Sequence, residues 1–140
     1  MGGLEEALGY RGTQDRRQGN SIRILLADDE TSLRLMLTRV LERQGWLVTA
    51  ADDGQSAIDA WPEGGESYDV VILDMQMPDF NGAEVYDVLS QRQPPARFMF
   101  ITGYMGWQPW ERIVASNMPI LLKPFKPTEL VAKIKQMLGA

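Results

Sequence analysis

The chain contains the run Val70-Val71-Ile72-Leu73-Asp74, four apolar residues followed by a single carboxylate. An uninterrupted apolar run of this length is typical of a strand covered on both faces, as strands are in a parallel sheet. Weaker apolar runs lie on both sides of it along the chain, and each has strand character. Together they predict five strands, at 22–27, 46–51, 70–73, 97–101 and 120–122.

Stretches with a helical spacing of apolar residues separate the predicted strands. Leu33, Leu37 and Leu41 recur every four residues, and Gly45 then ends that helix. Five strands alternating with five helices predict a doubly wound α/β fold, in which helices cover both faces of a parallel sheet in three α/β/α layers. The predicted helices lie at about 33–42, 54–61, 83–91, 110–116 and 128–138.

Length and composition limit the classes of protein that fit. The 140 residues amount to one domain, expected over 21–140, with residues 1–20 as a charged, glycine-rich tail or linker. No apolar run approaches the roughly 20 residues that cross a membrane, and no signal peptide opens the chain. The net charge of -5 provides no basic field, so we expect no binding to nucleic acid.

Two residue types are missing, which narrows the chemistry. The chain has no cysteine, which excludes disulfides and thiolate metal sites and is compatible with the reducing cytoplasm, where we expect the protein. It has no histidine, which excludes an imidazole base and histidine metal ligands. Carboxylates, hydroxyls and lysines remain to carry any reaction.

Reactive side chains follow four of the five predicted strands. Asp28 and Asp29 follow the first strand, and Asp74 follows the third. Thr102 follows the fourth strand and Lys123 the fifth. In doubly wound folds the carboxyl ends of the strands share one rim, and ligands bind there. Three carboxylates on one rim repel one another unless a cation neutralises them, and magnesium, which prefers oxygen ligands, is the cation we expect.

The same side chains suit phosphoryl transfer. A carboxylate such as Asp74 can act as a nucleophile and become an aspartyl phosphate. The phosphoryl oxygens then need opposite charge and hydrogen-bond donors, which magnesium, Lys123 and the Thr102 hydroxyl can supply. Taken singly, each residue has a more ordinary interpretation: Asp28 or Asp29 as a helix N-cap, Thr102 as a turn residue, and Lys123 as a solvated charge. Their joint occurrence at strand ends favours the phosphoryl site.

From residue 22 to residue 138 the sequence resembles the receiver domains of bacterial two-component response regulators. No single motif is specific, but the motifs are specific in combination. The resemblance implies a flavodoxin-like fold with the strand order 2-1-3-4-5. The motifs are Ile24-Leu25-Leu26-Ala27-Asp28-Asp29-Glu30, Ala51-Asp52-Asp53-Gly54, Asp74-Met75-Gln76-Met77-Pro78 with Gly82, Phe100-Ile101-Thr102-Gly103-Tyr104, and Lys123-Pro124-Phe125.

The resemblance also implies roles for individual residues. Asp74 is the implied phosphoacceptor, with Thr102 and Lys123 contacting the phosphoryl group. A cis peptide is expected between Lys123 and Pro124, an isomer found in about 5–6% of X-Pro bonds generally. Such a receiver catalyses its own phosphorylation and dephosphorylation but is otherwise a signalling module and not an enzyme. The implied magnesium ligands are Asp29, Asp74 and the backbone carbonyl of Gln76, with Asp28 acting through water.

Partners follow from the same resemblance. The expected phosphoryl donor is a phosphohistidine on a sensor histidine kinase or on a histidine phosphotransfer protein. No output domain is visible after Leu138, which favours a stand-alone regulator or the receiver of a hybrid histidine kinase over a transcription factor. The downstream partner stays open, and a second copy of the chain, forming a homodimer, is one candidate.

One position departs from the family pattern. Receivers usually carry Tyr or Phe three residues before the lysine of the fifth strand, and rotation of that ring couples to the threonine; here the residue is Ile120. An aliphatic side chain cannot swing as an aromatic ring does, so we expect the usual switch to be altered. Three aromatic residues nearby, Tyr104, Trp107 and Trp110, predict an apolar partner surface.

Two other classes of protein compete with this interpretation. An aspartyl-phosphate phosphatase of the haloacid dehalogenase class has a related fold, but it needs a second Asp two residues after the nucleophile, where Gln76 stands. A flavin or nucleotide binder needs a phosphate-binding loop after the first strand, where Asp28 and Asp29 stand instead. An acidic pair there repels phosphate unless a metal ion intervenes.

Overall fold

The computed structural model describes residues 21–62, 67–103 and 109–139, without the side chains of residues 109 and 110. These residues form a five-stranded sheet in which all neighbouring strands pair in parallel, in the order β2-β1-β3-β4-β5. The predicted fold class and strand order are therefore confirmed. The expected tail at 1–20 lies outside the described residues, so the domain boundary stays a prediction. The strands are β1 (Arg23–Ala27), β2 (Leu47–Ala51), β3 (Val70–Asp74), β4 (Arg97–Thr102) and β5 (Ile120–Leu122).

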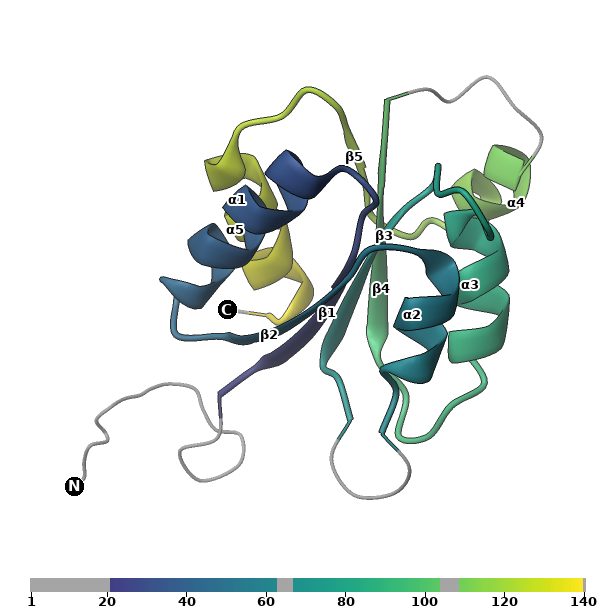
Figure 1. Ribbon diagram of the computed structural model, residues 1–140, viewed down its shortest axis with the longest axis horizontal. Coiled ribbons are helices and arrows are strands. Elements are labelled where there is room, and N and C mark those ends of the chain that lie inside the picture. The colour runs from purple at the N-terminus through teal and green to yellow at the C-terminus, as the bar shows by residue number, and fades with distance from the viewer. Residues whose placement is uncertain (1–20, 63–66, 104–108, 140) are drawn as a thin grey trace.

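Helices cover both faces of the sheet. Figure 1 shows α1 and α5 in one layer and α2, α3 and α4 in the other. In the part of the chain that the structure describes, no helix is both long enough and apolar enough to cross a membrane. The helices are α1 (Thr31–Glu42), α2 (Gly54–Asp59), α3 (Gly82–Leu89), α4 (Pro109–Ala115) and α5 (Pro127–Met137).

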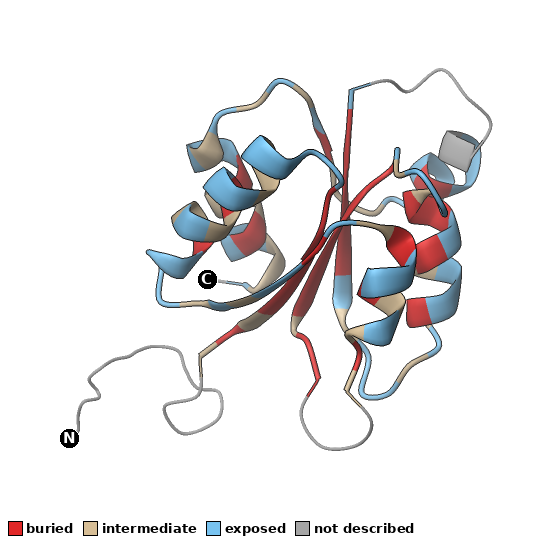
Figure 2. Cartoon of the chain, in the orientation of Figure 1, coloured by how far each residue is buried: buried red, intermediate tan, exposed pale blue. Residues whose placement is uncertain are grey.

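The central strand β3 is buried along its whole length, as its apolar sequence predicts. Its side chains alternate between the two faces of the sheet, so that Val71 and Leu73 face one core and Val70 and Ile72 face the other. Figure 2 shows the buried residues concentrated in the inner strands β1, β3 and β4 and on the sides of the helices that face the sheet. Each fully buried Val, Leu or Ile contributes roughly 1.5–3 kcal/mol of transfer free energy, so two cores hold this strand in position.

Helices α1 and α5, which form one of the two helical layers, each present one apolar stripe to the sheet. Leu37 and Leu41 of α1 are fully buried, and so are Leu130 and Ile134 of α5. Residues four apart lie on the same face of a helix, so each pair forms a continuous contact with the sheet. Val131 and Met137 of α5, and Leu138 just after its end, are partly buried against the same core.

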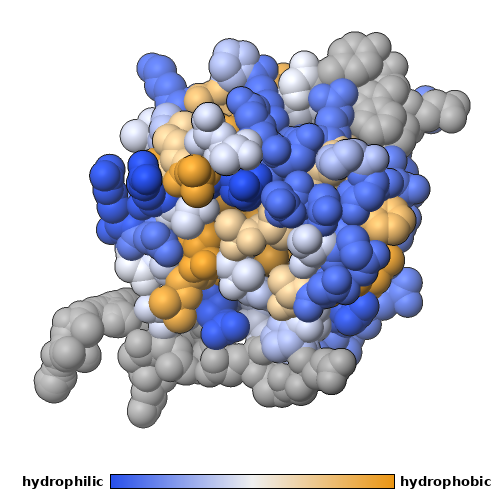
Figure 3. Space-filling view, in the orientation of Figure 1, coloured by the Kyte–Doolittle hydropathy of each residue, from blue (hydrophilic) through white to orange (hydrophobic). Residues whose placement is uncertain are grey.

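The surface is mostly polar. Figure 3 shows one face of the molecule, on which hydrophobic side chains form small areas bordered by hydrophilic ones. Leu35, Leu47 and Val114 are among the large apolar residues that are about half exposed. Apolar residues exposed in this way are normal on a protein surface and identify no partner by themselves.

The register of the strands brings the predicted site residues to one rim of the sheet. Asp28 and Asp74 lie side by side, because β1 and β3 pair in register up to the residues that precede them. Thr102 follows the β4 residue that pairs with Asp74. Lys123 follows the β5 residue that pairs with Thr102. Side chains that are up to 95 positions apart in the sequence therefore meet at the carboxyl ends of four strands.

Candidate functional site

Three carboxylates meet at the ends of β1 and β3. Asp28, Asp29 and Asp74 each offer one carboxylate oxygen, and these oxygens lie within 4.8 Å of one another. Asp28 is 0% exposed and Asp74 is 2% exposed, whereas Asp29 faces solvent. Like charges at this distance repel strongly where burial removes water. The three predicted acids are thus brought together in an arrangement that a cation can stabilise.

Backbone hydrogen bonds hold Asp28 in place. Its amide donates to the carbonyl of Ala51 in β2 over 3.1 Å, and its Oδ1 accepts from the amide of Glu30 over 2.8 Å. Among the described residues its buried Oδ2 has no hydrogen-bond partner, although Lys123 Nζ lies 3.6 Å away. The N-cap residue of α1 is Glu30, so neither aspartate fills the role of helix cap that the sequence left open. A buried carboxylate oxygen without a hydrogen bond indicates a place for a ligand.

The surroundings of Asp28 change its acidity. Burial is the largest cause and raises the pKa of Asp28 to about 6 from an ordinary value of 3.8. The hydrogen bond from Glu30 opposes this shift, the negative charge of Asp74 adds to it, and the positive charge of Lys123 opposes it. In the metal-free protein, Asp28 is therefore mostly charged only above about pH 6.

Lys123 connects the acids. Its Nζ lies 3.0 Å from Oδ2 of Asp74, 3.6 Å from Oδ2 of Asp28 and 3.8 Å from Oε1 of Glu30. Burial by itself would lower the pKa of Lys123. The hydrogen bond and charge of Asp74, followed by the charges of Asp28 and Glu30, outweigh burial and raise that pKa above its ordinary value of 10.5. Lys123 is thus a permanent positive charge beside Asp74.

Thr102 and Lys123 lie at the ends of neighbouring strands. Thr102 is fully buried, and its carbonyl accepts from the amide of Lys123 over 2.7 Å. The peptide between Lys123 and Pro124 is cis, as predicted. A second cis peptide joins Gln93 to Pro94, and nothing in the local sequence distinguishes that bond from a trans one.

The loop that follows Asp74 is tightly closed. Oδ1 of Asp74 accepts from the amide of Gln76 over 3.1 Å, and the amide of Gly82 donates to the carbonyl of Met75 over 3.1 Å. A Cβ on Gly82 would lie 2.8 Å from the carbonyl oxygen of Asp74, so only glycine fits without a shift of the backbone. This closure restrains the backbone at Gln76, whose carbonyl is the implied magnesium ligand.

The same loop contains a residue that the motifs did not single out. Asp79 accepts two hydrogen bonds from the start of α2, through Oδ1 from the amide of Gly54 (2.9 Å) and through Oδ2 from the amide of Gln55 (2.8 Å). These partners are 25 and 24 positions away in the sequence, so no local spacing indicates the contact. Asp79 joins the loop after the predicted phosphoacceptor to the helix after β2.

The predicted switch residues are only partly visible. Ile120 is half-buried, lies opposite Phe100 in the sheet and packs against the core on the side of α2 and α3. Tyr104 and Trp107 lie outside the described residues, and Trp110 lies in α4 without a described side chain. The partner surface around them therefore stays a prediction.

Comparison with known proteins identifies the family of this fold and site. Residues 24–135 match the family model of the response regulator receiver domain. The response regulator receiver protein CpdR of Brucella abortus (strain 2308) is 34% identical over 120 residues, which cover 84% of this chain and 98% of CpdR. The sensor kinase CckA of the same organism is 32% identical over 124 residues, which cover 84% of this chain and 13% of CckA.

A solved structure shares the fold. The response regulator protein TrrA of Thermotoga maritima, crystallised in complex with Mg2+-BeF, is 29% identical and superposes with a TM-score of 0.70. The superposition covers 83% of this chain and 98% of the TrrA chain. The family that the sequence motifs indicated is thereby confirmed. The chain belongs to the response regulator receiver domains, which are signalling modules of two-component systems and not classical enzymes.

Proposed function

We propose that Asp74 accepts a phosphoryl group and that the phosphorylated chain then signals to a partner. One observation carries this proposal: three carboxylates lie within 4.8 Å of one another, and the ammonium of Lys123 lies 3.0 Å from Asp74. Of the three acids, Asp74 is the one closest to Lys123. It is therefore the acid whose phosphoryl group this ammonium would stabilise best.

In the proposed reaction, a carboxylate oxygen of Asp74 attacks the phosphorus of a phosphohistidine. The bond between that oxygen and phosphorus forms as the P–N bond of the donor breaks, and the departing imidazole takes up a proton. Lys123 then compensates the charge of the phosphoryl oxygens, and the hydroxyl of Thr102 is the proposed hydrogen-bond donor to them. Attack by water later returns Asp74 to the carboxylate and releases inorganic phosphate.

The residues at the rim fit a magnesium ion. The buried Oδ2 of Asp28, which has no hydrogen-bond partner among the described residues, is the clearest sign that a cation belongs there. We propose that Asp29, Asp74 and the backbone carbonyl of Gln76 bind Mg2+ directly and that Asp28 binds it through water. When bound, the ion neutralises the clustered carboxylates and the phosphoryl oxygens. The Mg2+-BeF complex of TrrA supports this choice of metal.

The proposed donor is a sensor histidine kinase or a histidine phosphotransfer protein. CpdR is a receiver protein of nearly the same length as the matched region, and CckA is a sensor kinase of which that region is a small part. The likeness to both keeps a stand-alone regulator and a hybrid kinase receiver as candidates. We place the exchange with the donor in the cytoplasm, and a homodimer remains one candidate for the signalling form.

We further propose that Ile120, Tyr104, Trp107 and Trp110 belong to the surface that changes on phosphorylation. Ile120 supports this, because its strand partner Phe100 lies two residues before Thr102 on β4. A change at the Thr102 hydroxyl thus has a short path through paired strands to Ile120. The aliphatic side chain makes this path different from the rotation of an aromatic ring.

Beryllofluoride, which mimics a phosphoryl group on a carboxylate, tests these proposals together. With Mg2+ it should shift the backbone amide resonances of residues 28–30, 74–76 and 102–103 in the wild-type protein. Asp74→Asn should abolish these shifts, whereas Asp59→Asn, an exposed acid on α2, should respond as the wild type does. Shifts that persist in Asp74→Asn would contradict the acceptor assignment. Unchanged amide exchange over residues 109–116 on beryllofluoride binding would contradict the proposed partner surface.

A further inference from the structure

The carboxylate of Asp79 spans two segments that flank the acidic site. Besides the amides of Gly54 and Gln55, its Oδ1 accepts from the amide of Phe80 over 2.7 Å within its own loop. Charge-assisted hydrogen bonds of this kind are short and roughly twice as strong as neutral ones. One exposed side chain thus fixes the β3–α3 loop, residues 75–81, to the first turn of α2.

This contact completes a chain of contacts around the acids. On one side, the amide of Asp28 donates to Ala51 at the end of β2, three residues before Gly54. On the other side, Asp79 reaches back from the loop that begins at Asp74. Hydrogen bonds and short stretches of backbone therefore connect Asp28 to Ala51, Gly54, Asp79 and finally Asp74. Both ends of this chain of contacts are acids of the predicted metal site.

The segments in this path leave little room for adjustment. A Cβ on Gly54 would lie 2.8 Å from Cβ of Phe80 and 3.0 Å from Cγ2 of Val85, so the start of α2 lies directly against the loop and α3. Helix α2 has only six residues and depends on its neighbours for stability. Its second N-terminal contact, from the Ser56 amide to Oδ1 of Asp53 (2.7 Å), stays within the helix and does not reach the loop.

We propose that Asp79 is a positioning residue for the metal site, which acts by holding the β3–α3 loop so that the Gln76 carbonyl faces the three carboxylates. This inference rests on the proposed function, because it concerns the same magnesium ion. Asp79 itself touches neither the metal nor the phosphoryl group. Its effect is transmitted through the backbone between Asp74 and Asp79, and removal of such supporting contacts in metal sites typically costs 10–100-fold in affinity.

Thermodynamic reciprocity gives the inference a second consequence. If the Asp79 contact favours magnesium binding, then magnesium binding must favour the Asp79 contact by the same factor. The amides of Gly54 and Gln55 donate to Asp79 and exchange with solvent only when that contact opens. Saturation with Mg2+ should therefore slow the hydrogen exchange of these two amides by up to about ten-fold. The amide of Ser56, which donates to Asp53, should change less.

The test measures the dissociation constant of Mg2+ by calorimetry for wild type, Asp79→Asn and Asp53→Asn. Asp79→Asn keeps the shape of the side chain but replaces one carboxylate oxygen with an NH2 group. This group cannot accept the hydrogen bond from the amide of Gly54 or Gln55 that it faces. It should weaken magnesium binding by about ten-fold. Asp53→Asn removes the same charge and also weakens the start of α2, yet it should stay within about two-fold of the wild type, because Asp53 does not contact the loop.

The outcomes separate this inference from the proposed function. A wild-type protein that binds no Mg2+ would overturn the proposed function. If the wild type binds Mg2+ and the two variants, Asp79→Asn and Asp53→Asn, have the same dissociation constant as each other, only the role of Asp79 would be overturned. Amide exchange at Gly54 and Gln55 in the wild-type protein needs no substitution. Exchange rates there that do not respond to Mg2+ would also overturn that role, even if Asp79→Asn fails to fold.

Discussion

At the residue scale, the buried carboxylate of Asp28 decides how the metal-free site responds to pH. Burial raises its pKa to about 6, so between roughly pH 4 and 6 the folded protein keeps a proton that the unfolded chain has released. The free energy of unfolding should therefore fall as the pH rises through this interval. A shift of about two units corresponds to at most about 3 kcal/mol, and solvent screening near the rim reduces it.

Asp28→Asn should remove this dependence. In the presence of a chelator, the variant should exceed the wild type in free energy of unfolding by about 1–3 kcal/mol at pH 8, and the two should converge near pH 3.5, below the ordinary pKa of an aspartate. Urea unfolding at both pH values measures the difference. Asp59→Asn, an exposed acid on α2, is the control and should show no such divergence. An advantage of Asp28→Asn that is equal at both pH values would show that the charge of Asp28 is not its cause.

Gly82 is a second residue whose identity the site requires. A Cβ there would meet the carbonyl oxygen of Asp74 at 2.8 Å and Cα of Met75 at 3.1 Å, and neither backbone atom can move alone. Gly82→Ala should lower the free energy of unfolding by about 1–3 kcal/mol, because this crowding outweighs a gain in helix propensity of up to about 1 kcal/mol.

Gly103→Ala is the matched control for this substitution. Among the residues that the structure describes, a Cβ on Gly103 would meet only Cβ of Lys123, at an ordinary contact distance of 3.9 Å. Its free energy of unfolding, measured by urea titration, should stay within about 0.5 kcal/mol of the wild type. Equal losses in Gly82→Ala and Gly103→Ala would contradict the steric explanation.

The sequence predicts the charged residues at the rim of the sheet, but it does not predict the residues that hold them in place, and the reason is physical. Asp28, Asp74 and Lys123 each follow an apolar run, and parallel strands must bring such positions to one edge. The contact of Asp79 with Gly54 depends on how the loop after β3 packs on α2, which no periodicity along the chain encodes. The alternative interpretation of Asp28 or Asp29 as a helix N-cap is wrong, because the N-cap residue of α1 is Glu30.

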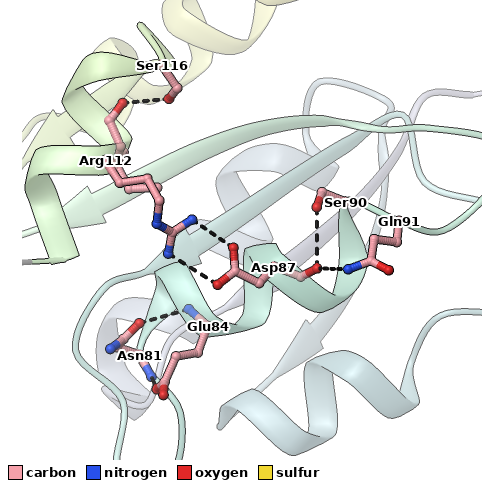
Figure 4. A network of polar contacts seen from close by, with 8 residues as sticks. Asn81, Glu84, Asp87, Ser90, Gln91, Arg112 and Ser116 are labelled. Atoms are coloured by element: carbon pink, nitrogen blue, oxygen red, sulfur yellow. Dashed lines mark hydrogen bonds and ion pairs between the residues drawn. The ribbon is translucent and has the colours of Figure 1, made fainter.

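At the scale of the elements, α3 and α4 are joined by an ion pair that Figure 4 shows from close by. Nη1 and Nη2 of Arg112 lie 2.7 and 3.2 Å from the two carboxylate oxygens of Asp87, so the contact is bidentate. The two side chains are 51% and 54% exposed, so water and salt screen them. We expect the pair to contribute little to total stability but to orient α4.

A double-mutant cycle with Asp87→Ala and Arg112→Ala measures this contact. The coupling free energy from urea unfolding should be about 0.5–1 kcal/mol at low ionic strength and should fall toward zero in about 1 M salt. The bidentate geometry favours the upper part of that range. A coupling that is absent at low salt, or unchanged at high salt, would contradict an electrostatic tie between α3 and α4.

Helix boundaries show where periodicity stops being informative. Helix α1 begins at Thr31, two residues before Leu33, the first apolar position of the pattern. Thr31 and Ser32 are polar and face solvent, so the spacing of apolar residues does not indicate that they belong to the helix. Helix α2 ends at Asp59, and Trp61, predicted to lie within it, packs edge-on against Tyr68 at 5.6 Å between ring centroids. Trp61 is thus buried in the core, as the apolar pattern indicates, but it lies beyond the end of the helix.

At the scale of the whole molecule, the strand order places the proposed chemistry at one end of the sheet. Asp74 lies at the end of the central strand, and Thr102 and Lys123 end the strands that lead toward α4 and α5. Phosphorylation at Asp74 should therefore be felt first along β4 and β5. In the proposed switch, Ile120 on β5 would make the route to the partner surface depend on strand packing and not on the rotation of an aromatic ring.

The most direct test of the central claim, that Asp74 is the phosphoacceptor, is the intact mass of the protein after incubation with acetyl phosphate and Mg2+. The wild type should gain the mass of one phosphoryl group and lose it again in hydroxylamine, which cleaves acyl phosphates. Asp74→Asn should gain nothing, and Asp59→Asn, an exposed acid on α2, should behave as the wild type does. A phosphoryl gain in Asp74→Asn equal to that of the wild type would contradict the account.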